Sequence, residues 1–187
     1  MPVVVKASRP KAIDIQVARS AGDAEEGAAG TAKLRNADLE MVHDGGEQTV
    51  GLRFSKVPIP QGATIDRAYI QFKVDETNSG DTSLTIAGED RDNASSFSAT
   101  HQNISSRTRT SVSVSWSPPA WDSVGKAGPK QCSPNIASIV QTLVSRLGWS
   151  SGNAMAFIIT GTGERTAESY DGDQAGAPTL HVEYTSP

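Results

Sequence analysis

Apolar and polar side chains alternate along most of this chain, and this two-residue period constrains the fold more than any other feature. Successive side chains of a β-strand point to opposite faces, so alternation indicates a strand with one face in the core. RAYIQFKVD, residues 67–75, places Ala68, Ile70, Phe72 and Val74 on one face. The same pattern predicts strands in five other segments, which are IDIQVAR, TVGLRF, SLTIAGE, SVSVSWS and TLHVEY. The continuously apolar AMAFIITG predicts a central strand, and AKLRNADLEMV, residues 32–42, is a weaker candidate.

Residues 134–147 depart from this period and predict the one helix of the chain. In SPNIASIVQTLVSRLG the apolar side chains recur at intervals of three and four, which is the spacing of an amphipathic helix. We expect Ser133 to cap this helix, Pro134 to occupy its first position and Gly148 to end it. The helix is expected to close one end of the fold or to cover a sheet edge.

Turn residues separate the predicted strands, as in HDGGE, IPQGA and TNSGD. Eight or nine strands without β-α-β alternation predict an all-β fold, an antiparallel β-sandwich of the jelly-roll type. The chain has 187 residues, enough for one domain with its own core. We therefore predict a single module over residues 1–187, with residues 1–12 and 186–187 as flanking segments. Residues 21–32, AGDAEEGAAGTA, are predicted to form a solvated surface loop.

Charge and composition exclude several classes of protein. The net charge is −4 and the chain has no block of Lys and Arg, so it lacks the basic surface of a nucleic-acid-binding protein. No apolar run approaches the roughly 18 residues of a membrane span. Cys132 is the single cysteine, so no intrachain disulfide is possible. MPVVVKASRP has too short an apolar stretch for a signal peptide, so the protein is either intracellular or a module cut from a longer secreted chain. We expect the second, as a monomer.

Two groups of carboxylates stand at predicted strand ends. The first is in GEDRDNASS, and the second is in RTAESYDGDQ, directly before the last strand. Such groups suit solvated turns, a calcium site with hard oxygen ligands, or the two acids of a glycosidase. We predict Glu89, Asp92, Glu168 and Asp171 as the metal ligands, with calcium as the ion.

Exposed aromatic rings are the second source of ligand predictions, because the apolar face of a sugar stacks on them. Trp121 follows two prolines in SPPAWDSVG and is predicted to be exposed in a loop. Trp149 and Tyr170 are predicted to assist it, whereas the alternation places Trp116 in the core. GWSSG, with Ser150 at its centre, fits the G-x-S-x-G pattern, but a helix precedes it and a strand follows, the reverse of a hydrolase elbow.

Several blocks resemble the DNRLRE-type β-sandwich modules of large bacterial extracellular proteins, some of which bind alginate and other polysaccharides. They are GLRFSKVPIPQGATIDRAYIQFKVDE, SVSWSPPAW, the helical segment with the apolar strand after it, and the closing APTLHVEY. The resemblance spans about residues 13–185. It implies a jelly-roll module that is appended to secreted enzymes, often with a structural calcium. The loop SSFSATHQNISSRTRT is longer than the short forms of that family.

These observations predict a non-catalytic accessory module of an extracellular bacterial protein. It is expected to bind a polysaccharide, to contain structural calcium, and to be joined to a catalytic or adhesive domain. The alternative is a structural or adhesive spacer that binds no sugar. A third interpretation, a small β-sandwich lyase or glycosidase, has no placed acid and base to support it.

Overall fold

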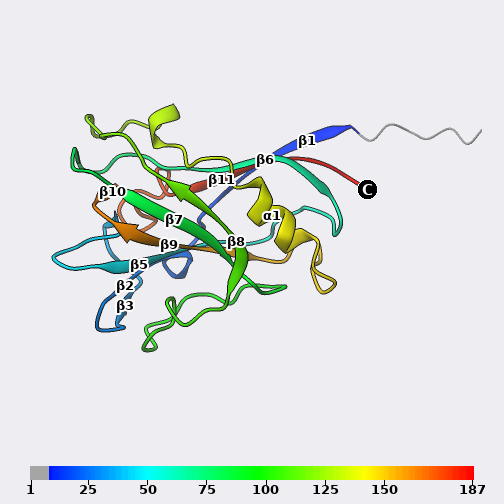
Figure 1. Ribbon diagram of the computed structural model, residues 1–187, viewed down its shortest axis with the longest axis horizontal. Coiled ribbons are helices and arrows are strands. Elements are labelled where there is room, and N and C mark those ends of the chain that lie inside the picture. The colour runs from blue at the N-terminus through cyan, green and yellow to red at the C-terminus, as the bar shows by residue number, and fades with distance from the viewer. Residues whose placement is uncertain (1–8) are drawn as a thin grey trace, which may run out of the picture.

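The computed structural model describes residues 9–187, so residues 1–8 of the predicted flanking segment lie outside the described residues. Strands dominate the described chain (Figure 1). In chain order the elements are β1 (Pro10–Gln16), η1 (Ser20–Gly22), β2 (Asp23–Gly27), β3 (Ala32–Lys33), β4 (Asp38–Met41), β5 (Gln48–Phe54), β6 (Thr64–Gln71), β7 (Ser83–Glu89), β8 (Arg109–Trp116), η2 (Pro129–Gln131), α1 (Ala137–Val144), β9 (Met155–Thr162), β10 (Arg165–Glu168) and β11 (Thr179–Thr185). No helix among residues 9–187 is long and apolar enough to cross a bilayer.

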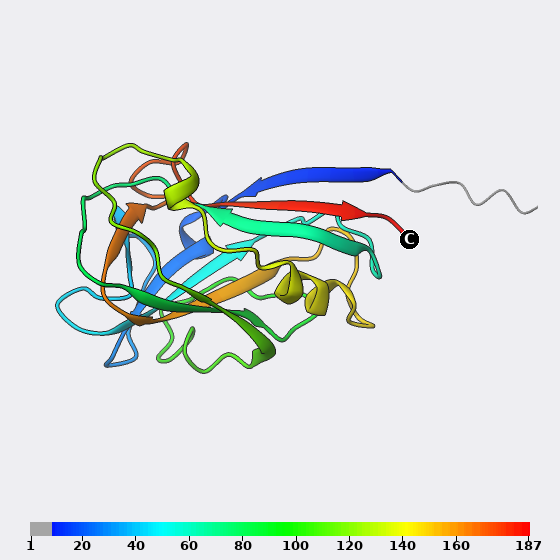
Figure 2. The ribbon, with the colours of Figure 1, turned by 45° about the horizontal axis from the view of Figure 1, so that its top comes forward.

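Two antiparallel sheets lie face to face, which confirms the predicted all-β sandwich (Figure 2). The smaller sheet has the strand order β1-β11-β6, and the larger has the order β3-β2-β5-β9-β7-β8. β10 and β4 form a separate antiparallel pair. The chain enters through β1 and leaves through β11, and these strands are neighbours, so Pro10 lies opposite Thr185 at one end of the sandwich.

The alternation predicts the core faces correctly. Along β11, Leu180, Val182 and Tyr184 are at most 4% exposed, while the side chains between them are half-buried. They pack with the inward residues of β6 and of the larger sheet in one continuous core. β9 is covered on both faces over Met155–Ile159, as its unbroken apolar sequence predicts.

The helix is shorter than predicted, because the chain before it is bound to β6. α1 covers Ala137–Val144 and contacts β6, β7 and β8, so it closes one side of the sandwich. Ser133 does not cap it: its hydroxyl accepts a hydrogen bond from the Ile70 N–H at 2.9 Å. The Ser133 N–H in turn donates to the Ile70 carbonyl. This segment therefore extends the edge of β6 before the helix begins.

The structure has eleven strands rather than eight or nine, and the differences fall where the sequence is polar. The predicted loop 21–32 contains the end of η1 and all of β2, and β2 is buried between β3 and β5. Residues 32–42 divide into β3 and β4, while β10 lies in a segment predicted to be a turn. β1 begins at Pro10, so residues 10–12 are not a flanking segment.

The long loop between β7 and β8 packs on the outer face of the larger sheet, below it in Figure 2. Phe97 and Ile104 from this loop form a second small core with alanines of β2 and β9 and with Ile158. These contacts hold the loop against the sheet along part of its length. It adds a third layer to the sandwich.

Candidate functional site

The two tryptophans predicted to stack on sugar are buried, so that prediction is wrong. Trp121 is 1% exposed and its indole N–H donates to the Lys130 carbonyl at 3.2 Å. Its backbone pairs with that of Asn78 in an isolated β-bridge at the edge of the core. The centre of its ring lies 6.3 Å from the centre of the Phe72 ring. Trp149 is 2% exposed and donates to the Ile59 carbonyl at 2.9 Å. In both cases a buried carbonyl binds the polar end of the ring, so each tryptophan functions as a packing residue.

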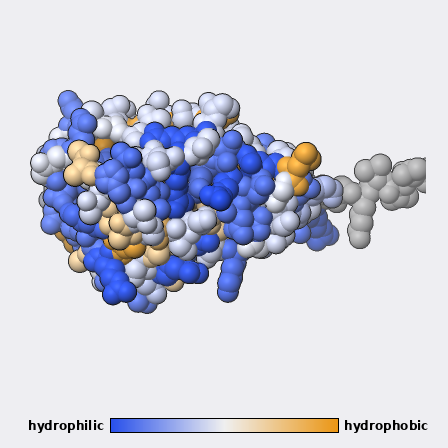
Figure 3. Space-filling view, turned by 90° about the horizontal axis from the view of Figure 1, so that it is seen from below, coloured by the Kyte–Doolittle hydropathy of each residue, from blue (hydrophilic) through white to orange (hydrophobic). Residues whose placement is uncertain are grey.

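Tyr170 is half-buried and packs against the core. The surface itself offers no broad apolar platform on the face seen from below, which is mostly hydrophilic with small separate hydrophobic patches (Figure 3). Stacking on a broad aromatic surface therefore does not explain ligand binding on this face.

The structure does not bring the four predicted metal ligands together. Glu89 is buried against the Arg107 guanidinium at 2.8 Å, and Asp92 accepts from Arg146 at 2.6 Å. Glu168 lies 3.7 Å from the Lys73 ammonium, and Asp171 accepts from the Ser20 hydroxyl at 2.9 Å. The first two carboxylates are paired with arginines, which compete with a cation for their oxygens.

The acids of β2 are buried and bind the backbone of two loops and of strand β4, which the sequence analysis missed. Asp23 accepts from the Tyr170 N–H at 2.7 Å, and Glu26 accepts from the Ile104 N–H at 2.6 Å. Glu25, 1% exposed, accepts from the Glu40 N–H. These charge-assisted bonds hold strand β4 and two loops against the larger sheet.

Asp23 predicts a measurable pH dependence of stability. Burial raises its pKa from 3.8 to about 6, against the lowering effect of the Tyr170 N–H. The folded state holds the proton of the Asp23 carboxyl more tightly than the unfolded state does. This protonation therefore stabilises the folded state fully below pH 3.8, and the stabilisation is lost as the pH rises through about 6. Asp23→Asn keeps an acceptor for the Tyr170 N–H but cannot titrate. It is expected to remove on the order of 3 kcal/mol from the change of the free energy of unfolding with pH. Urea denaturation from pH 4 to 7 measures it, and curves parallel to those of the unchanged protein would contradict it.

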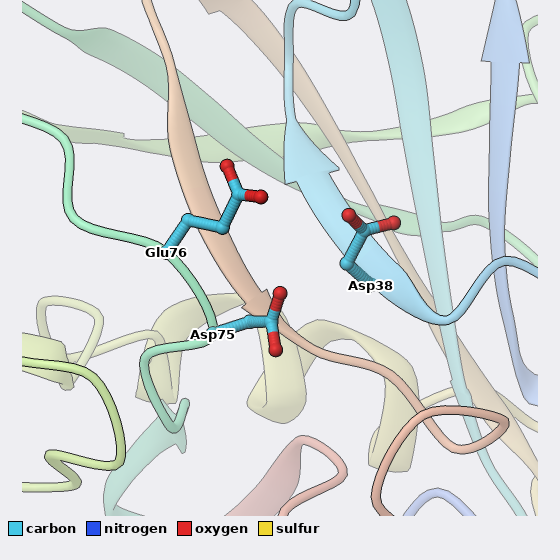
Figure 4. A group of neighbouring side chains, drawn as sticks. All are labelled: Asp38, Asp75 and Glu76. Atoms are coloured by element: carbon cyan, nitrogen blue, oxygen red, sulfur yellow. The ribbon is translucent and has the colours of Figure 1, made fainter.

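A compact group of carboxylates does occur, on other residues. Asp38, Asp75 and Glu76 each offer an oxygen within 4.8 Å of the other two, and their side chains point into the same space (Figure 4). Burial raises the pKa of Asp75, and the negative charge of Asp38 raises it further. Burial and then Asp75 raise the pKa of Glu168, which borders this group. An all-oxygen group of this kind suits a hard divalent cation.

A polar hollow lies among elements that meet at the end of the sandwich opposite Pro10 and Thr185; Figure 1 shows where these elements lie. It has a volume of about 280 Å³ between the β2–β3 turn, the start of β5, the end of β9 and the loop around Gln102. The side chains of Thr49, Gln102, Ser105 and Thr160 line it. None of these four polar groups is engaged in a side-chain hydrogen bond with residues 9–187, so they are available to a ligand.

No protein-family model and no curated protein matches this chain. The resemblance to DNRLRE-type modules therefore stays a prediction. The hollow and the carboxylate group are the features from which a function can be argued.

Proposed function

We propose that the chain is a non-catalytic binding module of an extracellular protein, and that the polar hollow holds a sugar residue of a neutral polysaccharide. The observation that carries this proposal is the set of uncommitted hydrogen-bonding groups around a space of about 280 Å³. This volume is close to the lower end of ligand pockets, roughly 300 Å³. Hydroxyl and amide groups both donate and accept, as the hydroxyls of a sugar do.

Recognition would rest on hydrogen bonds rather than on stacking, since Trp121 and Trp149 are buried. Each such bond contributes about 0.5–1.5 kcal/mol, so a single bound sugar residue is expected to bind weakly. The elements that line the hollow lie at the opposite end of the sandwich from Pro10 and Thr185 (Figure 1). A parent protein attached at that end would leave the hollow accessible to a polymer.

The burial of all three tryptophans favours a second candidate, a structural module that binds no sugar. Neither Trp116 nor the other two presents a ring face to solvent, and a spacer needs only a stable sandwich. Retention on polysaccharide separates the two functions. The structural module predicts no retention on any polymer tested.

Thr160→Val combined with Gln102→Leu is expected to weaken retention by about tenfold or more, because each change removes a hydrogen-bonding group worth about 1 kcal/mol. Affinity electrophoresis in xylan and in agarose, with alginate as the anionic comparison, measures this. Thr64→Val, an exposed change on β6, is the control and should leave retention unchanged. Retention that survives the double variant would place the ligand elsewhere, and no retention by the unchanged protein would favour the spacer.

A further inference from the structure

Three chain segments that are distant in sequence meet on one face beside β4 and β10. The two strands pair so that Asp38 lies opposite Glu168 and Glu40 lies opposite Thr166. The chain at residues 74–76 follows the other edge of β10. There the Thr166 carbonyl accepts hydrogen bonds from the backbone N–H groups of positions 75 and 76, at 3.0 and 3.4 Å. These contacts place the carboxylates of Figure 4 around β10.

The Thr166 hydroxyl is on the same face as these carboxylates. Leu39 and Ala167, which lie opposite each other, are 1% and 0% exposed and point into the core. Side chains alternate along a strand, so Thr166 projects from the other face, with Asp38 and Glu168. Its hydroxyl oxygen is buried and forms no hydrogen bond with residues 9–187. A buried hydroxyl without a partner is costly, so it points to a ligand with a polar atom on this face.

The three carboxylates of Asp38, Asp75 and Glu76 have no cationic partner in an ion pair within residues 9–187. On the same face, the Lys73 ammonium contacts Asp173 at 2.6 Å and Glu168 at 3.7 Å. Lys33, the other nearby cation, contacts Asp44 at 2.9 Å. Like charges that are close together and partly buried destabilise the folded state unless a cation offsets them.

We propose that this face binds a calcium ion through the carboxylates of Asp38, Asp75 and Glu76, with the Thr166 hydroxyl beside them. Calcium accepts six to eight oxygen ligands in flexible geometry, and oxygens from three segments (β4, residues 75–76 and β10) suit it. Magnesium demands a near-ideal octahedron, and zinc favours His and Cys, which this group lacks. The bound ion fastens β4 to the chain after β6, so it stabilises the sandwich independently of the polar hollow.

Calorimetric titration of the whole chain with calcium chloride tests the site, with magnesium chloride as the comparison. We expect saturable calcium binding, and at 100 times the dissociation constant the folded-to-unfolded ratio rises about 100-fold. The double variant Asp75→Asn/Glu76→Gln should lose both effects. The double variant Asp66→Asn/Asp122→Asn removes two exposed carboxylates elsewhere and should keep both. Absence of saturable binding, or the same calcium response in the first variant, would overturn the proposal.

Thr166→Val provides a second test that does not depend on removing charge. Valine keeps the shape of threonine without its hydroxyl, so the calcium-free protein should be at least as stable as before. Calcium affinity is expected to fall about tenfold. An unchanged affinity would contradict the place of this hydroxyl beside the ion.

Discussion

Replacing Arg165 with methionine is expected to lower the free energy of unfolding by about 3–5 kcal/mol. The side chain is 2% exposed, and its guanidinium donates to the carbonyls of Pro118, Pro119 and Gly80 and to the Thr82 hydroxyl. Burial lowers its pKa from the ordinary value. One planar group thus satisfies the backbone of two loops, and methionine would leave those carbonyls buried without donors.

Urea denaturation measures this loss, and Arg35→Met, an exposed change of the same chemistry, should stay within about 0.5 kcal/mol of the unchanged protein. Arg165→Lys keeps the charge but not the fork of donors, so it should fall between the two. A methionine variant as stable as the Arg35 control would show that water replaces the guanidinium at these carbonyls.

The spacing of apolar side chains along the chain predicts the fold well where the buried side chains are apolar and the exposed ones are polar. The strands around Ile70, Val182 and Ile158 and the helix at Val140 are buried where their apolar side chains recur. β2 could not be found in this way, because Asp23, Glu25 and Glu26 are buried by bonds to distant loops. The free energy that holds such a strand comes from partners that no window of sequence contains.

The candidate site was also hard to predict, because it too depends on residues that are distant in the sequence. The sequence predicts metal ligands where acids are dense, at Glu89, Asp92 and Asp171, but density along the chain says nothing about neutralising arginines. Asp38 and Asp75 lie far apart in the sequence and meet only through the pairing of β10. One local signal was available: Asp38 and Glu40 alternate with the apolar Leu39 and Met41, which indicates a strand with an acidic outer face.

Phe97→Ala is expected to destabilise the protein by about 3–5 kcal/mol, as large-to-small changes in a core do. The ring is 2% exposed and lies between the larger sheet and the Arg107 guanidinium, which is 4.3 Å from its centre. It contacts the sheet at Gly51, where a Cβ atom would lie 2.5 Å from the tip of the ring. The Phe97 ring therefore occupies the space that a larger side chain at position 51 of β5 would fill.

A double-mutant cycle tests this contact directly. Gly51→Ala alone should cost about 1–3 kcal/mol, because the new methyl displaces a packed ring. In the Phe97→Ala background the same change should cost little, since the cavity accepts the methyl, and the difference is the coupling energy. Protease cleavage within residues 90–108 should increase in both single variants, because the ring anchors this loop to the sheet. Additive losses of stability would show that the loop is held chiefly by its polar contacts, through Glu26 and Arg107, rather than by the ring.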